Sequence, residues 1–177
     1  MSRIPAIDPT TATGATAELF ETARRKMGAV PNVLRVLGNS PAALQAYLTL
    51  SEVLAGSRFD AREREAIALA VAGANACDYC ASAHGFIAKN LRVGDEEIRR
   101  HLEGHSDDPR LDAALQFARA VVDKKGWADD GDLAAARDGG LDDQQIVEVV
   151  ALTVANILTN YTNHIAGTEI DFPLLSA

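Results

Sequence analysis

An uncharged run of eleven residues, at positions 66–76, restricts most strongly the folds open to this chain. The charged residues 62–64 come shortly before it, and Asp60 stands before them as an N-cap residue. A charged first turn followed by an apolar run predicts a helix that enters the core and is surrounded there by other helices. Gly73 and Asn75 mark its expected end, because both residue types favour turns.

The other segments have helical spacing as well. Apolar residues recur at three- and four-residue intervals, and no segment alternates between hairpin turns as strands do. The apolar residues are mostly Ala, Leu, Val and Ile, and only 5% of the chain is aromatic, which favours packed helices over a sandwich. Seven further helices are expected, over residues 15–27, 41–54, 77–91, 95–101, 110–125, 129–138 and 142–166.

The length of 177 residues suits one domain with a core of its own. The sequence therefore predicts a single all-α domain of about eight helices. Residues 1–14 are expected to form an extended N-terminal arm. A weak repeat is also visible, because residues 59–85 can be laid on residues 141–167 at a constant offset. The match is short, and it leaves gene duplication and coincidence equally open.

Charge and hydropathy narrow the range of partners. The net charge is -8 and the chain has no basic block, which argues against a nucleic-acid partner and against an anionic membrane surface. The N-terminus has no apolar segment typical of a secretory signal, and residues 146–158 are too short a run to span a membrane. The expected location is the cytoplasm, where a lone CxxC is more often redox-active or metal-binding than a structural disulfide.

The chemistry is concentrated in one short segment. Cys77 and Cys80 are the only two cysteines in the chain, and they stand three residues apart. His84 follows Cys80 by four residues, so the two side chains lie on one face of a helix. The His84 imidazole is then within reach of the thiol proton of Cys80. Glu65 comes twelve residues before Cys77. Only a chain reversal near residues 73–75 would bring Glu65 beside His84, because one straight helix would hold Glu65 and Cys77 ~18 Å apart.

These residues together predict a reactive dithiol in residues 59–91. Sulfurs in the first turn of a helix are stabilised as thiolates by free N–H groups. Cys80 is expected to be the more readily ionised thiol because His84 lies one turn along its own face. Cys77 would then condense with an oxidised Cys80 and form a disulfide. No metal or organic cofactor is required for this cycle.

Other interpretations remain open for the same residues. The two cysteines could be a buried pair of small side chains, or they could serve a redox-responsive interaction module without turnover. Cys77, Cys80, His84 and Glu65 could instead bind zinc in a structural protein, although the second Cys/His pair common in such sites is absent. Haem attachment is excluded because Ala81 stands where that motif needs histidine.

Four other side chains have less specific expectations. Tyr79 is expected to be a half-buried aromatic and not a catalytic acid. His101 and His105 lie in a polar, Asp-rich stretch and are expected to be solvated. His164, near the end of the last helix, faces the reactive dithiol only if the internal repeat is real.

The ordered set Glu65, Cys77, Cys80 and His84, as E-x11-CxxC-x3-H, resembles the signature of AhpD-like alkylhydroperoxidases in the carboxymuconolactone decarboxylase superfamily. The resemblance to the peroxidase-related subgroup extends over the segments MGAVPNVLRVLGNSP, ALQFARAVVDKKG and NYTNHIAGTEIDFP. It implies an AhpD-like helical bundle with a repeated helical motif, assembled as trimers or hexamers.

The resemblance also implies the roles of the four residues. Cys80 would be the peroxidatic thiol, Cys77 its disulfide partner, and His84 with Glu65 the proton relay. The substrate would be a peroxide, and an external dithiol of the lipoyl type would reduce the disulfide. The best-known members have histidine where this chain has Tyr79, so one member of their relay is replaced. The decarboxylase branch lacks the CxxC, which makes lactone decarboxylation an unexpected activity here.

Overall fold

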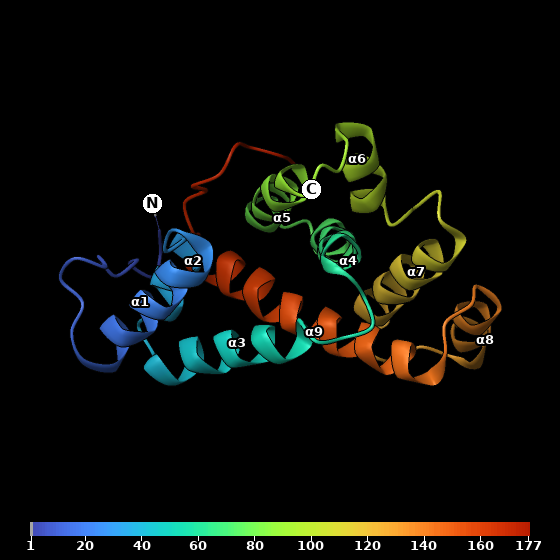
Figure 1. Ribbon diagram of the computed structural model, residues 1–177, viewed down its shortest axis with the longest axis horizontal. Coiled ribbons are helices and arrows are strands. Elements are labelled where there is room, and N and C mark those ends of the chain that lie inside the picture. The colour runs from blue at the N-terminus through green and yellow to red at the C-terminus, as the bar shows by residue number, and fades with distance from the viewer. Residues whose placement is uncertain (1) are drawn as a thin grey trace.

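Nine helices and no strand make up residues 2–177, the part of the chain that the computed structural model describes (Figure 1). The all-α prediction is confirmed. In chain order the helices are α1 (Gly14–Met27), α2 (Asn32–Leu37), α3 (Pro41–Leu54), α4 (Ala61–Ala74), α5 (Asp78–Asn90), α6 (Asp95–Glu103), α7 (Pro109–Asp123), α8 (Asp130–Asp138) and α9 (Asp143–Ala166). Residue 1 of the expected N-terminal arm lies outside the described residues, and residues 2–13 contain no helix.

One of the nine helices, α2, was not expected from the sequence. It is only six residues long and begins directly after Pro31, which serves as its N-cap residue. A proline three residues beyond Gly28 is typical of a loop after a helix end, and this is why the short element was missed. Val33, Leu34 and Leu37 are buried, so packing stabilises a helix that would be too short to form alone.

Helix α4 is the centre of the fold and packs against α5, α6, α7 and α9 (Figure 1). Its residues 66–72 are all buried, which confirms the predicted core helix up to that point. The end of the apolar run is less buried, and Ala76 is exposed. Gly73 is required by the packing, because a Cβ there would lie 2.0 Å from the backbone oxygen of Leu102 in α6.

Two groups of buried side chains meet along α4. Leu69 and Ala72 belong to a cluster with residues of α1, α2, α3, α5 and α6, and this cluster includes both cysteines. Ile67 and Val71 belong to a second cluster with residues of α7, α8 and α9. The dithiol therefore lies in the core between α4 and the N-terminal helices.

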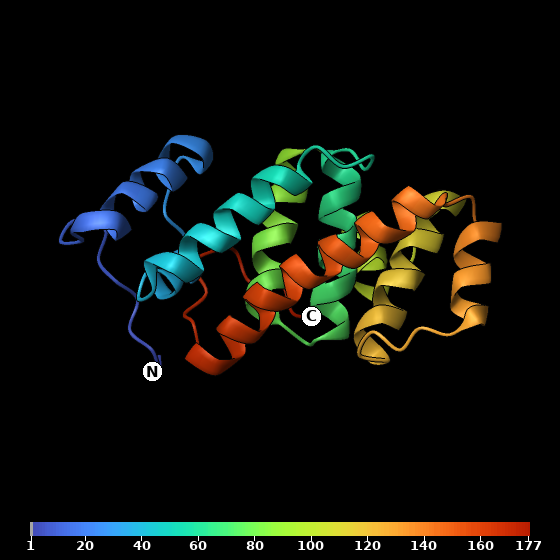
Figure 2. The ribbon, with the colours of Figure 1, turned by 90° about the horizontal axis from the view of Figure 1, so that it is seen from below.

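The longest helix, α9, has 24 residues and runs across the molecule beside α3 (Figure 2). It also bears on the weak sequence repeat, for which duplication and coincidence were equally open. Residues 59–85 contain two helices, α4 and part of α5, separated by a turn, whereas residues 141–167 contain one unbroken helix. The sequence match between these segments therefore does not correspond to a repeat of elements.

No helix within residues 2–177 has both the length and the apolar character needed to cross a membrane.

The C-terminal tail, residues 168–177, folds back over α5. The Leu175 N–H donates to Ser82 Oγ at 2.9 Å, and the Ala177 N–H donates to Asp78 Oδ1 at 2.9 Å. A Cβ at Gly85 would lie 2.7 Å from Leu175 Cδ2, so glycine allows the tail to lie close to the helix. Phe172 packs edge-on against Tyr79, with ring centroids 5.9 Å apart. The tail thereby covers the helix that carries the CxxC.

Candidate active site

A three-residue turn between α4 and α5 positions the cysteines. Asn75 ends α4, and Ala76 adopts a left-handed conformation with φ 51°, which non-glycine residues rarely do. Cys77 is the N-cap residue of α5, and its N–H donates back to the Ala72 carbonyl at 2.9 Å. The prediction that the CxxC opens the helix ending near Leu91 is confirmed. The turn also brings α5 back along α4, as the expected reversal required.

The two sulfurs lie in contact and are buried. Cys77 Sγ and Cys80 Sγ are 2.8 Å apart, and both cysteines are free. The Cys80 N–H donates to Cys77 Sγ at 3.4 Å, in the manner of an N-cap side chain. From α9, Asn163 Nδ2 donates to Cys80 Sγ at 3.3 Å. A disulfide needs the sulfurs about 2.05 Å apart, so this pair closes one with a small movement.

The thiols differ in acidity, and the order is opposite to the expectation. An ionised Cys77 accepts a hydrogen bond from the Cys80 thiol and another from the Cys80 N–H, and these lower the pKa of Cys77 although burial opposes ionisation. The same sulfur–sulfur hydrogen bond, together with burial, raises the pKa of Cys80. The sulfur–sulfur hydrogen bond therefore favours the negative charge on Cys77, and the helical spacing of His84 from Cys80 does not reverse this order.

Glu65 and His84 form the contact that the sequence predicted. His84 Nδ1 and Glu65 Oε2 are 2.7 Å apart, and both side chains are partly buried. Burial disfavours the charge on His84, but the Glu65 carboxylate outweighs it through charge and hydrogen bonding, so the pKa of His84 is raised above its usual value. The Cys77 sulfur adds to this effect. Within residues 2–177, His84 makes no hydrogen bond to either sulfur.

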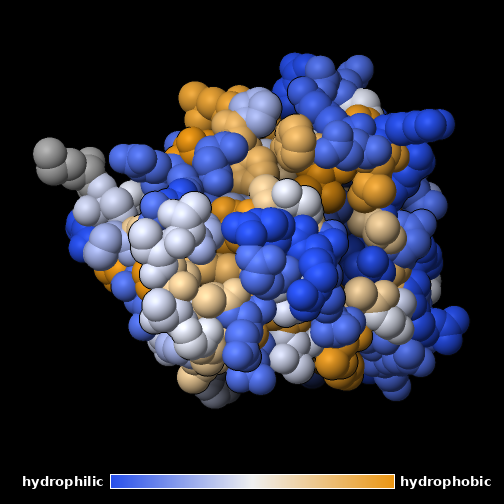
Figure 3. All heavy atoms as spheres, turned by 60° about the vertical axis from the view of Figure 1, so that its left-hand side comes forward, coloured by the Kyte–Doolittle hydropathy of each residue, from blue (hydrophilic) through white to orange (hydrophobic). Residues whose placement is uncertain are grey.

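Cys80 and His84 share a small apolar cavity of about 80 Å³. It lies between α5, the N-terminal helices and the tail, and Figure 3 views the molecule from the side of α1 and α2, where apolar side chains lie in patches among polar ones. The cavity is lined by Met27, Pro31, Val33, Leu34, Tyr47, Tyr79, Cys80, Ala83, His84, Ile87, Thr159, Asn163 and Phe172. Such a cavity suits a small apolar molecule placed next to a thiol and an imidazole.

Tyr79 is fully buried, not half-buried as expected, and its hydroxyl is occupied. The hydroxyl accepts the Val33 N–H at 3.0 Å and donates to Asp171 Oδ1 at 2.8 Å. Burial, with the Asp171 carboxylate, raises the pKa of Tyr79 well above its usual value. Tyr79 therefore joins α2, α5 and the tail through its hydroxyl and is not placed to relay a proton.

Replacing Tyr79 with phenylalanine should lower the free energy of unfolding by about 1–3 kcal/mol. The substitution leaves the buried Val33 N–H without an acceptor, and an unsatisfied buried donor has roughly this cost. Urea unfolding of the variant and of the parent protein measures the change. Equal stabilities of the two proteins would show that the Tyr79 hydroxyl has no such role.

Two buried amides of α9 were missed by the sequence reasoning. Asn163 reaches the Cys80 sulfur, and Asn160, which accepts a hydrogen bond from Asn75 Nδ2 at 2.9 Å, is also buried. Both amides favour the ionised form of Cys80 and so oppose the rise of its pKa. Their spacing of three residues, which places both amides on one face of the helix, was a signal that could have identified them.

The three other histidines lie apart from the dithiol or at its edge. His101 was expected to be solvated, but it is 3% exposed, and burial lowers its pKa below the usual value. It sits on the inner side of the short helix α6, which carries its charged residues outward. His105 is exposed, as expected. His164 is exposed and borders a separate cleft that also includes Cys77.

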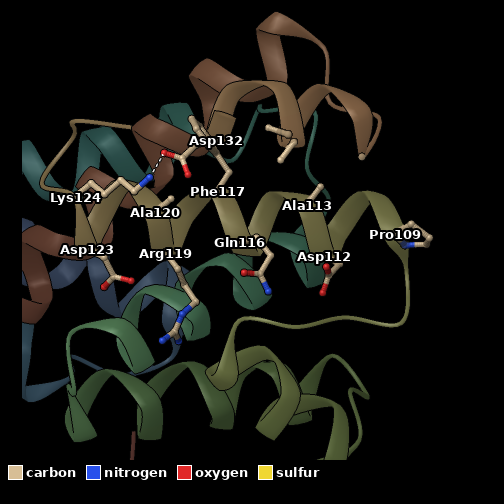
Figure 4. A pocket seen from close by; sticks show the side chains of 13 residues that line it. Pro109, Asp112, Ala113, Gln116, Phe117, Arg119, Ala120, Asp123, Lys124 and Asp132 are labelled. Carbon is tan, nitrogen blue, oxygen red and sulfur yellow. Dashed lines mark hydrogen bonds and ion pairs between the residues drawn. The ribbon is translucent and has the colours of Figure 1, made fainter. Parts of the chain in front are cut away.

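A larger cleft, about 610 Å³, lies along α7 and α8 but contains neither sulfur nor histidine (Figure 4). Its cations already have partners, since Lys124 Nζ contacts Asp129 and Asp132, and Arg119 donates to the Leu102 carbonyl.

Across residues 2–177, no three His, Cys, Asp or Glu side chains are grouped so that they could hold a metal ion. The proposed zinc ligands Cys77, Cys80, His84 and Glu65 are therefore not arranged as a metal site.

Comparisons with known proteins agree with this fold. Residues 41–120 match the model of the carboxymuconolactone decarboxylase family. An alkyl hydroperoxide reductase of Mycobacterium tuberculosis is 35% identical over 85 residues, which are 48% of this chain and 25% of that protein. The chain thus spans about a quarter of the length of this curated relative.

Two crystal structures match nearly the whole chain. One is an uncharacterized peroxidase-related protein of Ralstonia eutropha JMP134, described as an alkylhydroperoxidase AhpD core, with TM-score 0.84 and 26% identity over 96% of this chain and 92% of that one. The other is an uncharacterized peroxidase-related protein of Silicibacter sp. TM1040, with TM-score 0.80 and 25% identity over 94% and 89% of the two chains. Over residues 41–120 the chain is therefore similar to the carboxymuconolactone decarboxylase family, and its fold is that of the AhpD-like proteins.

Proposed function

We propose that this protein is a cysteine-based peroxidase that reduces hydroperoxides with the Cys77–Cys80 dithiol. The observation that carries the proposal is the buried sulfur pair, 2.8 Å apart, with the His84–Glu65 pair beside it. A thiolate and an imidazolium held together supply the nucleophile and the acid that cleavage of a peroxide bond requires. The names of the relatives support the same class of reaction.

Cys80 is proposed as the thiol that attacks the peroxide, because it shares the apolar cavity with His84. At rest the negative charge favours Cys77, so the proton of Cys80 first passes to Cys77 along the sulfur–sulfur hydrogen bond. Asn163 Nδ2 donates to the Cys80 thiolate that results. The proton transfer is short, and it keeps a single charge within the buried pair.

The remaining steps balance in protons and electrons. The Cys80 thiolate takes the terminal oxygen of the peroxide, the O–O bond breaks, and His84 gives its proton to the alkoxide that leaves. Cys77 then attacks the Cys80 sulfenic acid, and water leaves as the disulfide forms. One hydroperoxide becomes an alcohol and water, and two thiols become one disulfide. An external dithiol, of the lipoyl type in the proposal, must then restore the thiols.

A single experiment separates turnover from the two rival functions. Purified protein is mixed with cumene hydroperoxide and dithiothreitol, and loss of peroxide is followed while free thiols are counted before and after one equivalent of oxidant. We expect two thiols lost per peroxide consumed and continued turnover with dithiothreitol. One round of oxidation without turnover would favour a redox-responsive interaction module. Zinc in the purified protein, released together with loss of structure, would favour the structural protein.

The proposed assembly is a homo-oligomer in which a second copy covers one face of α9. Apolar side chains form a continuous exposed stripe along this helix, Val147, Val150, Val154, Leu158, Tyr161 and Ile165. Their spacing keeps them on one side of the helix, opposite the side that faces the core. A stripe of this kind can pack on its own copy about a two-fold axis.

Replacing Val154 with aspartate should shift the protein from oligomer to monomer. The substitution places a charge in the middle of the stripe, where it would be buried without a partner. Light scattering at micromolar concentration measures the mass, and Val53→Asp, an exposed apolar position on α3, is the control. An unchanged mass for Val154→Asp, or a monomeric parent protein, would contradict the proposed interface.

A further inference from the structure

Cys77 and Cys80 border different cavities although their sulfurs are 2.8 Å apart. Cys80 lines the apolar cavity with His84, and Cys77 does not. Cys77 lines a second cleft of about 200 Å³, and Cys80 does not. Tyr79 and Asn163 border both spaces and so stand between them. The dithiol therefore has two sides, one for each sulfur.

The second cleft, called the Cys77 cleft from here on, is formed by the start of α5, the end of α9 and the first residues of the tail. It is lined by Ala76, Cys77, Asp78, Tyr79, Asn163, His164, Gly167, Thr168 and Ile170. Polar side chains make up a larger share of its lining than of the lining of the apolar cavity, and one of them is the exposed His164.

Two buried polar atoms on residues of this cleft have no partner within residues 2–177. They are Asn163 Oδ1, on a side chain that is 4% exposed in all, and Thr168 Oγ1. A buried acceptor without a hydrogen bond has a free-energy cost of about 1–3 kcal/mol, so such atoms point to a ligand that donates to them. A thiol or hydroxyl group is a donor of the right kind.

We propose that the Cys77 cleft is the entry site of the external dithiol, which attacks Cys77, while hydroperoxide reaches Cys80 from the apolar cavity on the other side. The inference rests on the proposed function, because it assigns the two substrates of that reaction to two sites. A thiolate that breaks a disulfide approaches the attacked sulfur from the side opposite the leaving sulfur. The Cys77 cleft borders the attacked sulfur and not the leaving one, as such an approach requires.

The exchange then proceeds in two balanced steps. A thiolate of the reductant bonds to Cys77 Sγ, the Cys77–Cys80 bond breaks, and Cys80 leaves as a thiolate that accepts from Asn163 Nδ2. The second thiol of the reductant attacks its own sulfur in the mixed disulfide and releases Cys77. The reductant loses two electrons and two protons and becomes a cyclic disulfide, and the cysteines gain them as two thiols.

The charge around the cleft defines the class of dithiol. The Asp78 carboxylate borders it, and α9 ends beside it at Ala166 with its negative helix pole. Both disfavour an anionic reductant. An uncharged dithiol that can close into a cyclic disulfide therefore fits the cleft, and dithiothreitol is a suitable probe.

Mapping of the mixed disulfide tests the attacked sulfur directly. The protein is oxidised with diamide, so that the test does not depend on peroxidase activity, and is then exposed briefly to the uncharged monothiol 2-mercaptoethanol. After acid quenching and blocking of free thiols, mass spectrometry locates the adduct. We expect it on Cys77 in about tenfold excess at the earliest times. An adduct mainly on Cys80 would overturn the proposal, whether or not the protein reduces peroxides.

A pair of bulky substitutions tests the two entrances. Thr168→Phe fills the Cys77 cleft, and Ile87→Phe fills the rim of the apolar cavity. Reduction of the diamide-formed disulfide by dithiothreitol should be about tenfold slower in Thr168→Phe than in Ile87→Phe, and oxidation of the thiols by cumene hydroperoxide should show the reverse order. If both variants slow the same half-reaction, or if neither affects reduction, the two-entrance proposal is wrong. If cumene hydroperoxide oxidises neither the parent protein nor the two variants, but the difference in reduction rate is observed, the proposed function fails and the assignment of the cleft stands.

Discussion

Replacing Cys80 with serine should abolish the rapid oxidation of this protein by hydroperoxides. Serine cannot form a sulfenic acid, and Cys77 does not line the apolar cavity that Cys80 shares with His84. Replacing Cys77 with serine should instead leave one rapid oxidation of Cys80, which stalls at the sulfenic acid or beyond because the condensing thiol is gone. Trapping with a dimedone-type reagent followed by mass spectrometry should place the label on Cys80 in the Cys77→Ser variant.

The opposite result would be attack on the peroxide by Cys77, whose pKa is the lower of the two. If resting charge alone decides the attack, rapid oxidation would survive in Cys80→Ser and the label would lie on Cys77. Access to the cavity would then be unimportant, and the roles of the cysteines would be reversed. A double Cys77→Ser, Cys80→Ser variant gives the background rate, since the chain has no other cysteine.

The contact between Glu65 and His84 could be predicted because local sequence determines it. An uncharged helix ends at turn-compatible residues, and a second helix begins at the first cysteine, so the two helices must lie side by side. The spacings of eleven and six residues between Glu65, Cys77 and His84 then place the carboxylate against the imidazole. Neither step needed a contact from a distant part of the chain.

The features that escaped prediction depend on distant segments. Asn163 reaches Cys80 from α9, more than eighty residues further along the chain. The tail fixes the Tyr79 hydroxyl through Asp171, and the short helix α2 forms because its apolar side is covered. His101 is buried by packing that its polar neighbours in the sequence conceal. Such contacts are set by tertiary packing, which local pattern does not encode.

The order of thiol acidity is a separate case, because every residue involved was already identified. The spacing of His84 favoured Cys80, whereas the N-cap position of Cys77 gives its sulfur the Cys80 N–H and the Cys80 thiol as donors. Two sulfurs in contact share one proton, so stabilising one thiolate destabilises the other. The result depends on the side-chain conformation at the first turn, and residue spacing alone does not determine it.

Replacing His84 with glutamine should slow oxidation of the dithiol by roughly 10²–10⁴-fold, the usual effect of losing a general acid or base. The alkoxide that leaves the peroxide would have to take its proton from water. The disulfide should still form, because both sulfurs remain in contact. Stopped-flow measurement of thiol loss after mixing with cumene hydroperoxide gives the rate, and an unchanged rate would remove His84 from the mechanism.

Replacing Glu65 with glutamine should change the pH dependence of the same step. The carboxylate raises the pKa of His84 against the effect of burial, so in its absence burial should bring the pKa below the usual value of 6.5. The acid form of His84 is the proton donor, and its population falls as the pH rises through its pKa. The decline in rate should therefore begin at lower pH in Glu65→Gln, and the loss relative to the parent protein should be greater at pH 7.5 than at pH 5.5.

A second histidine, the buried His101, provides a comparison for His84. His101 is buried with Glu97 at 3.9 Å instead of 2.7 Å, and its pKa is lowered. Glu97→Gln is therefore the matched control, because it removes a carboxylate beside a buried histidine that lies outside the site. It should leave the pH dependence of the oxidation rate unchanged. Nuclear magnetic resonance titration of the imidazole signals reports both histidines at once. A His84 signal that titrates at the same pH in Glu65→Gln and in the parent protein would show that the carboxylate does not control the proton donor.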